Sequence, residues 1–504
     1  MSRGNAGDAI VDGAFDEMAD ADAAFVAAMA HRHVTLAQLI GAARQLEQAY
    51  ARNGYILVRV SVPPQRLAPG APVRVVVIDG FVEELDTTHV AAPIRSAVVA
   101  RLRPLVGRHH VMQDQIERSL LLAGDLAGAR LRSAIGPGHA PGGVRLVVEG
   151  SFARAEGALG ADNSLPASLG QWEFSGNMAL NGPLGIGDQF YVSAGSQAAI
   201  GRYGFPKSAM GMIGAGNVLP LDYDGTTLTG EYLTSRTQPA PQPGVPLSVA
   251  NYTRVMLRLH AALLRTREQE LNLSNSYELI TQAVKLPQFD AEISRDHYLA
   301  CRLGLDWQRT FRTIPAGLRA TFSQGLGGRD SSAALPTSRR GANADFHAFE
   351  LTGQVTLPGP SGFALALTGR GKTGFGRPLF LSEQFALDAP GAVSSFPGGS
   401  FNVDSGATLR TELRDPPMAI GRSLMLAPYV FGAHGWGWQV NPTAVEQGFV
   451  SAASAGMGSR ISLDGTPWLK ATDASIGVEI GHQFSNLPAR HNGNRASLTA
   501  GFRF

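Results

Sequence analysis

The 504-residue chain carries 43 Lys and Arg against 41 Asp and Glu, a balance that excludes the strongly basic surface expected of a nucleic-acid-binding protein. Only 17% of its residues are charged, below the ~25% typical of soluble domains, whereas glycine is abundant at 60 residues. Few charges, many glycines and no apolar run long enough for a membrane-spanning helix favour many alternating strands joined by tight turns.

The N-terminal part predicts a small mixed domain. Residues 1–22 are acidic and contain neither the basic region nor the apolar region of an export signal. Apolar residues then recur at helical spacing over 36–50, and Asn53-Gly54 is a helix stop. Residues 55–62 alternate as a strand, and residues 72–80 supply another strand that ends in a glycine turn.

The same order of elements is predicted a second time. Residues 114–122 have helical spacing, residues 124–135 lead into a strand, and residues 142–150 form a strand that ends on glycine. The glycine-terminated strands Val73–Gly80 and Val144–Gly150 are the clearest internal repeat. We therefore predict two small α+β domains, at residues 1–86 and 87–150.

These domains resemble the POTRA domains of two-partner secretion transporters of the haemolysin secretion/activation type. The motif that carries the resemblance comprises Gly54, Tyr55, Pro64, Gln65, Gly70 and Gly80. A POTRA domain begins with a strand, and only residues 9–15 remain where that strand should finish. The resemblance implies either that the first domain is truncated, with its first strand largely missing, or that the chain as given starts late. A late start would also account for the absent export signal.

The remaining residues, 151–504, predict a barrel. Segments with one apolar face and one small or polar face follow one another, which is typical of a membrane barrel with a hydrated interior. The segments are 171–182, 189–197, 227–235, 254–265, 298–308, 316–326, 348–357, 363–371, 427–438, 474–484 and 495–504. Each spanning strand needs about 9–11 residues, so this length accommodates sixteen strands with long surface loops. We predict a 16-stranded transmembrane antiparallel β-barrel.

The last segment alternates Leu498, Ala500, Phe502 and Phe504 to one face and ends on an aromatic residue. It resembles the C-terminal strand of bacterial outer-membrane proteins, in which the terminal Phe belongs to the signal read by the barrel insertion machinery. The resemblance makes Phe502 and Phe504 that insertion signal. The alternative is a soluble sandwich whose last strand ends on Phe.

Short motifs do not support catalysis. The segment TGRGKT at 368–373 has Ala366 where a phosphate-binding loop needs glycine, and residues 214–219 fail the dinucleotide fingerprint at its third glycine. The close histidine pairs, His31/His33 and His109/His110, have no further ligand at metal spacing. The single Cys301 excludes an internal disulfide and a cysteine-based metal cluster. We expect no enzyme activity, cofactor, metal or nucleotide.

A loop around residues 385–410 also resembles the transporter family, which belongs to the wider superfamily of outer-membrane assembly factors. There, a surface loop folds back into the barrel, and a Val-Arg-Gly-aromatic tip pairs its arginine with the aspartate of a Phe-x-Asp-x-Gly strand. The flanking residues of this chain match: Glu383, Gln384, Phe385, Asp404, Gly406 and Glu412.

The tip and its partner strand depart from that pattern. The tip reads Val393, Ser394, Ser395 and Phe396, with serines in place of arginine and glycine, and the strand carries Phe431, Ala433 and Gly435, with alanine in place of aspartate. Losing both members of an ion pair can be nearly neutral for folding. We therefore expect packing and neutral hydrogen bonds to hold the loop inside the barrel.

The resemblance implies a transporter of the Gram-negative outer membrane with its POTRA domains in the periplasm. It would capture an unfolded exoprotein and translocate it to the cell surface. Its partners would be that exoprotein, outer-membrane lipid and the insertion machinery, with no nucleic acid. The absent ion pair and the incomplete first domain leave open a passive pore or a degenerate surface barrel. A factor that inserts other barrels is a further alternative, which the two POTRA repeats and the secretion-type loop flanks disfavour.

Overall fold

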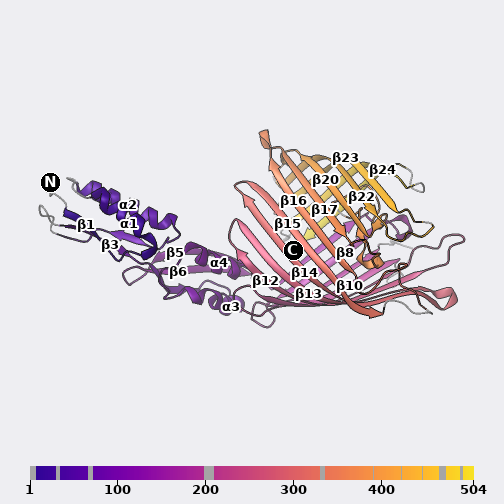
Figure 1. The fold of residues 1–504 in the computed structure, drawn as a ribbon, viewed down its shortest axis with the longest axis horizontal. Helices are drawn as coiled ribbons and strands as arrows, with labels where there is room; N and C mark the ends of the chain where they lie inside the picture. The colour runs from indigo at the N-terminus through magenta and orange to yellow at the C-terminus, as the bar shows by residue number, and fades with distance from the viewer. Residues whose placement is uncertain are drawn as a thin grey trace. The chain divides into compact units, whose positions relative to one another are not determined.

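The computed structural model describes residues 7–29, 35–65, 72–197, 209–329, 335–389, 391–421, 423–444, 446–464, 473–487 and 492–504 (Figure 1). The chain divides into two compact units, Met1–Ala153 and, apart from residues 185–187, Arg154–Phe504. Among the described residues, no helix combines the length and the apolar character needed to cross a membrane.

The first unit begins with a domain of strand–helix–helix–strand–strand order. Its elements are β1 (Gly7–Asp12), α1 (Ala19–Met29), α2 (Leu36–Arg52), β2 (Arg59–Ser61) and β3 (Pro72–Ile78). The sheet order is β1-β3-β2, with β1 parallel to β3 and β2 antiparallel to it. The helix α2 starts with a capping box, in which Thr35 and Gln38 each accept the other's main-chain N–H. One face of α2 supplies the core, as its periodicity predicted.

The expectation that the first strand of this domain is largely missing is wrong, because β1 is present. It has six residues and pairs with β3 from Gly7 opposite Pro72 to Asp12 opposite Val76. Ala9 and Val11 pack into the core, but the residue between them is the exposed Ile10, so the segment shows no clear alternation without its partner strand. The helix α1 was not predicted either, because its apolar residues are mostly alanine.

The second domain repeats this topology. Its elements are β4 (Phe81–Asp86), α3 (Ala92–Leu102), α4 (Gln113–Gly124), β5 (Ala129–Pro137) and β6 (Gly143–Phe152), in the sheet order β4-β6-β5. The boundary expected after residue 86, between domains 1–86 and 87–150, moves to residue 80. The reason is that β4 pairs in parallel with β6, from Phe81 opposite Gly143 to Asp86 opposite Val147.

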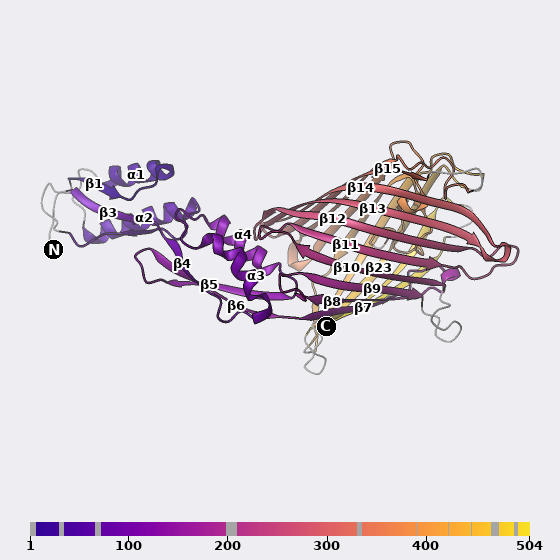
Figure 2. The ribbon, with the colours of Figure 1, turned by 90° about the horizontal axis from the view of Figure 1, so that it is seen from below.

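The second unit is a closed barrel. Its strands are β7 (Ala155–Asp162), β8 (Glu173–Asn181), β9 (Gln189–Gln197), β10 (Met210–Pro220), β11 (Thr227–Thr237), β12 (Val249–Arg265), β13 (Gln269–Leu286), β14 (Ala291–Phe311), β15 (Ile314–Arg329), β16 (His347–Pro358), β17 (Ala364–Thr373), β20 (Ser405–Arg414), β21 (Met418–Ile420), β22 (Leu424–Trp438), β23 (Phe449–Asp464), β24 (Asp473–Ser485) and β25 (Asn494–Arg503). Figure 2 shows β7 to β15 side by side.

The strands β20 and β21 both pair with β22, so they form one position that is interrupted at Pro416-Pro417, where the chain lacks main-chain donors. Counted this way over the described residues, sixteen positions close the barrel, which confirms the predicted fold. The closing pair joins β25 to β7, from Thr499 opposite Asp162 to Arg503 opposite Ala158.

The two faces of the barrel wall differ as predicted. Along β22, Tyr429, Phe431, Ala433 and Gly435 are buried, and the residues between them are exposed, such as Val430 at 51%. Large apolar side chains are exposed on other strands too, and the outer face therefore suits a lipid environment.

All predicted barrel segments lie on strands, but several strands were not predicted. For example, β23 reads FVSAASAGMGSRISLD, in which small residues on both faces weaken the alternation. Residues 368–373 lie in β17 and residues 214–219 in β10, so both rejected nucleotide motifs are parts of strands.

Candidate functional site

The candidate site is the segment between β17 and β20, residues 374–404, which we call the lumen loop. It contains a short 3-10 helix, Leu381–Glu383, and a small hairpin in which β18 (Phe385–Ala386) pairs with β19 (Asn402–Val403). The loop contacts the inner face of the wall. A Cβ on the inward-facing Gly435 would lie 3.2 Å from Val393 Cγ2.

An apolar cluster forms the body of the lumen loop. It consists of Phe385, Leu387, Val393, Phe396, Phe401 and Val403, packed against Val450 and Ala452 of β23. The rings of Phe396 and Phe401 meet edge to face with centroids 4.8 Å apart. Two of the predicted tip residues, Val393 and Phe396, therefore anchor the loop by packing.

Glu383 fixes the first flank of the loop to the wall. Its carboxylate accepts two hydrogen bonds from Arg302 of β14, at 2.6 and 3.0 Å, and one from the Tyr298 hydroxyl at 2.7 Å. Arg302 also pairs with Glu278 of β13 at 3.1 Å. Glu383 is only 2% exposed, so this buried carboxylate depends on these donors.

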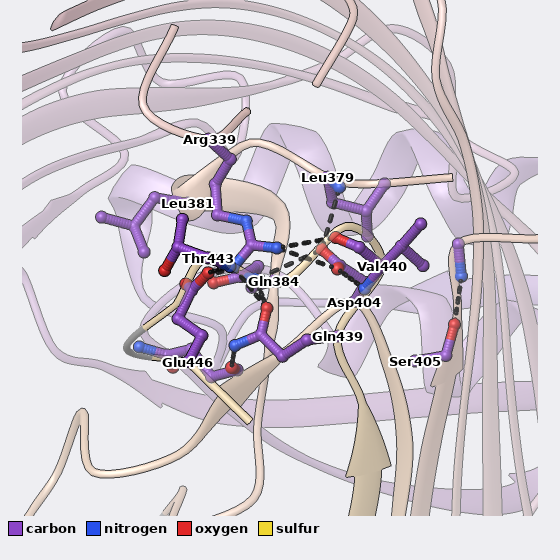
Figure 3. Close-up of polar contacts among 12 residues, drawn as sticks. Arg339, Leu379, Leu381, Gln384, Asp404, Ser405, Gln439, Val440, Thr443 and Glu446 are labelled. Carbon is purple, nitrogen blue, oxygen red and sulfur yellow. Dashed lines mark hydrogen bonds and ion pairs between the residues drawn. The ribbon is translucent and has the colours of Figure 1, made fainter. Parts of the chain in front are cut away.

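Asp404 fixes the second flank (Figure 3). This fully buried carboxylate accepts hydrogen bonds from the main-chain N–H groups of Leu379 at 2.9 Å and Val440 at 2.7 Å. It also accepts bonds from Gln384 Nε2 at 3.2 Å and Arg339 Nη2 at 3.3 Å. The structure thus brings the predicted residues Gln384 and Asp404 together.

Arg339 connects Asp404 to two further surface segments. It belongs to residues 335–346, between β15 and β16, and is 6% exposed. Its guanidinium also pairs with Glu446 at 2.7 Å and donates to the carbonyl of Val440 at 3.1 Å, both between β22 and β23. Three segments at one end of the barrel therefore share one buried ion-pair network.

Charged groups of the wall surround the serines at the tip. Ser394 Oγ donates to Glu479 of β24 and accepts a hydrogen bond from Arg410 Nη1 of β20 at 2.7 Å. The carbonyl of Ser395 accepts a hydrogen bond from Gln483. The expectation that neutral hydrogen bonds hold the tip is therefore met at Ser395 but wrong at Ser394, whose partners are the acidic Glu479 and the basic Arg410.

The predicted partner strand faces the loop. The Phe431 ring stacks under the Arg410 guanidinium at 4.1 Å, and Gly435 approaches Val393 closely. Ala433 faces inward on the same strand and is the cross-strand neighbour of Arg410.

The remaining flank residues have structural roles. Glu412 pairs with arginines of the wall, at 2.9 Å to Arg410 and Arg414 and 3.0 Å to Arg460, rather than with the loop. Gly406 allows a close approach, because a Cβ there would lie 2.7 Å from the carbonyl of Trp436.

The POTRA motif residues stabilise the first domain. Gly54 has φ +96°, and its carbonyl accepts from the Gln113 N–H at 2.7 Å. Tyr55 is buried, and the Gln65 side chain bonds to both main-chain groups of Arg74, at 2.7 and 2.8 Å. The Leu57 main chain leaves no room for a side chain at Gly80, and Pro64 is exposed. Gly70 lies outside the described residues.

Of the terminal aromatic residues, Phe502 lies on the closing strand β25 and Phe504 directly follows it. The main chain of Phe504 exchanges hydrogen bonds with Gly157, at 2.9 and 3.0 Å, and the Phe502 and Phe504 rings are 5.8 Å apart. Phe504 remains half exposed.

The histidine pairs do not form a metal site where the structure shows them. His109 Nδ1 lies 2.9 Å and His110 Nε2 3.6 Å from the same Asp79 carboxylate. His31 and His33 are outside the described residues. Among the residues the structure does describe, no group of three potential ligands could hold a metal ion.

Four charged residues of the site were not predicted from the sequence: Arg302, Arg339, Arg410 and Glu479. Three of them share a recognisable signal, since each is a charged residue in the middle of an alternating strand, where it has to face the hydrated interior. Arg339 lies in a loop and carries no such signal.

Comparisons with known proteins agree with this architecture. The model of the haemolysin secretion/activation protein family ShlB/FhaC/HecB matches residues 144–461, more than half of the chain, and the ShlB-type POTRA domain model matches residues 13–80. The solved structure of CdiB from Escherichia coli superposes with a TM-score of 0.77 at 18% identity, covering 100% of this chain and 91% of that one. BamA from Haemophilus ducreyi, lacking POTRA domains 1–3, superposes with a TM-score of 0.54 at 12% identity, covering 100% of each chain.

Curated relatives match over shorter regions. The heme/hemopexin transporter protein HuxB of Haemophilus influenzae is 22% identical over 161 residues, which is 31% of this chain and 28% of that protein. The outer membrane transporter CdiB of Escherichia coli is 26% identical over 152 residues, 30% of this chain and 25% of that protein. The matched region thus spans about a quarter of the length of these relatives.

Proposed function

The chain belongs to the haemolysin secretion/activation protein family of two-partner secretion transporters, and we propose that it captures an unfolded exoprotein in the periplasm and translocates it through its barrel to the cell surface. In this family the barrel lies in the Gram-negative outer membrane and the POTRA domains in the periplasm.

The main support for this proposal is that the lumen loop is attached to the inner face of the barrel. Its first flank is tied to the wall through Glu383. Its second flank is tied through Asp404 to Arg339 and Val440 of the neighbouring loops, and its tip packs against β22 and β23. A loop that buried ion pairs hold inside the barrel obstructs the lumen, and a permanently open pore does not require such an obstruction. A barrel that opens only while a chain passes through needs such a loop, since its charged bonds are local and reversible.

The lining of the lumen supports a polypeptide as the substrate class. A polar cavity of about 780 Å³ adjoins the base of the loop, lined among others by Tyr252, Arg254, Glu278, Arg302, Lys372 and Glu383. Side chains of both charges line it, so it favours no one charge on the passing chain. Such a lining suits an extended polypeptide of varied sequence.

We assign capture to the edges of the POTRA sheets. Each sheet places one strand in the middle, which leaves β1 and β2 as edges of the first sheet and β4 and β5 as edges of the second. A bound segment can add to such an edge through main-chain hydrogen bonds, which tolerate many side chains. The nine residues of β5 make it the longest of these edges.

Two further partners follow from the barrel itself. The exposed apolar side chains of the outer wall, such as Ile213 at 60% and Leu257 at 52%, would contact outer-membrane lipid. Phe502 and Phe504 would serve the insertion machinery as the terminal signal, and the open face of Phe504 leaves it accessible.

A secretion assay tests the proposal. The chain, fused to an export signal, is expressed in Escherichia coli together with each candidate exoprotein that the genomic neighbourhood encodes. We expect the exoprotein in the medium only when both are present. The passive-pore alternative, which the absent arginine at the tip favours, predicts no secretion and a steady high conductance in planar bilayers. That result would replace the transporter proposal.

A further inference from the structure

The wall carries a buried arginine where the loop tip lacks one. Arg410 of β20 is 4% exposed and stands directly across from Ala433 of β22 in the strand register. Ser394 occupies the tip position at which an arginine was expected, and its hydroxyl lies 2.7 Å from Arg410 Nη1. A guanidinium is thus present beside the tip, but it comes from the barrel.

The partners of Arg410 complete the arrangement. Its Nη2 pairs with Glu479 Oε2 at 2.6 Å, and the other oxygen of Glu479 accepts from Ser394. Arg410 Nη1 also reaches the carbonyl of Ala392 at 3.5 Å. Two hydrogen bonds of the guanidinium are therefore with the loop, and its shortest ion pair is with a wall residue that also holds the loop.

Glu412 does not depend on Arg410 in the same way. Although the two are 2.9 Å apart, Glu412 keeps Arg414 and Arg460 as partners. Without Arg410, in contrast, the hydrogen-bond donors that remain to Glu479 are two neutral hydroxyl groups, that of Tyr429 at 3.0 Å and that of Ser394. The loss of Arg410 therefore falls on Glu479 and the tip.

We propose that Arg410 and Glu479 are the positioning residues of the loop tip, so that the wall supplies both charges and the loop supplies only the Ser394 hydroxyl. This inference rests on the proposed function, because it assigns a positioning role at the tip of the same lumen loop. It has a physical consequence. When the tip leaves its seat, the ion pair stays intact on the wall, and no charge has to be withdrawn from a partner in the lumen.

An arginine swap tests the proposal on the full-length protein in lipid nanodiscs without any exoprotein. Hydrogen exchange is followed in peptides that cover residues 391–404. Ser394→Arg places a second guanidinium against Arg410, and Arg410→Ser removes the donor. Each is expected to speed exchange about 10- to 150-fold, the effect of losing one charge-assisted hydrogen bond. The double variant Ser394→Arg/Arg410→Ser returns the arginine to the loop and is expected to restore slow exchange.

Controls separate this role from general damage to the barrel. Arg460→Ser removes another arginine of the wall, one that pairs with Glu412, and is expected to leave the exchange of residues 391–404 unchanged. Heat-modifiable migration on gels shows that each barrel is folded. Recovery in the double variant cannot come from poor folding, since it contains both changes.

Either of two results overturns the proposal: slow exchange in Ser394→Arg alone, or a double variant that exchanges as fast as the faster single variant. Because no exoprotein is present, these outcomes are independent of secretion. A protein that passes this test yet fails the secretion assay would retain the tip assignment and lose the transporter function.

Discussion

Removing the guanidinium of Arg302 is expected to free the base of the lumen loop. Arg302 lies between two buried carboxylates, with Glu383 of the loop at 2.6 Å and Glu278 of β13 at 3.1 Å. The variant Arg302→Met keeps the volume of the side chain and removes its charge. Both carboxylates then remain buried without the charged hydrogen-bond donor that they share, so the free energy of the docked loop rises relative to the undocked loop.

The magnitude differs for the two members of the pair. Removing one partner of a buried ion pair costs about 3–5 kcal/mol, which shifts the docked-to-undocked ratio of the loop about 100- to 4000-fold in Arg302→Met. Glu383→Gln keeps a neutral acceptor, and Arg302 keeps Glu278, so the loss is nearer that of a charge-assisted hydrogen bond, about 1.5–3 kcal/mol or 10- to 150-fold. We therefore expect Arg302→Met to be the more damaging change.

Hydrogen exchange of peptides covering residues 381–389, with the protein in nanodiscs, measures this ratio, and bilayer conductance reports the opening of the lumen. Arg319→Met is the matched control, because Arg319 is 69% exposed in its side chain and pairs with Asp306 on the wall. Slow exchange in Arg302→Met, or faster exchange in Glu383→Gln than in Arg302→Met, would refute the reasoning that Arg302 compensates two carboxylates.

Three further changes have defined outcomes. Asp404→Asn should speed exchange of residues 439–444 about tenfold or more, because its amide nitrogen cannot accept the hydrogen bonds that both carboxylate oxygens now receive. Gly481→Val should raise bilayer conductance, since a Cβ at Gly481 meets the Phe431 ring at 3.0 Å and the Ser395 side chain, whereas Gly432→Val, with open space around it, should not. Burial raises the pKa of Asp22, although the hydrogen bond from Tyr50 opposes the shift. The folded domain thus binds the proton more tightly than the unfolded chain, and its stability falls as pH rises from about 3.8, the unfolded value, through the folded pKa. Asp22→Asn should abolish this fall, measured as protection factors of α2 amides between pH 4 and pH 7; an unchanged pH profile would contradict the assignment.

Much of the barrel could be predicted because its main signal, the alternation of apolar and polar residues, is contained within each strand. Alternation along a strand needs no knowledge of the partner strand, and the predicted segments therefore coincide with strands such as β9 and β22. Short elements could not be found in this way. The six residues of β1 become a strand only through their pairing with β3, and the alanine-rich α1 becomes a helix of the core through Phe25 and Met29.

The candidate site was predictable in part for the same reason. The flanks of the loop are a contiguous pattern, and their order along the chain led to Glu383, Gln384 and Asp404. The partners of Ser394 are not contiguous: Arg410 is 16 residues away on a wall strand and Glu479 is 85 residues away. Only the register of the closed barrel brings these two side chains to the tip.

The shared acceptor at Asp404 has a consequence for how this surface can vary. Residues 335–346, the lumen loop and residues 439–448 all meet through one carboxylate and one guanidinium. An insertion in any of these segments displaces a donor on which the other two rely. Loops usually vary more than the strands they connect, but these three are constrained to change together or to keep their length.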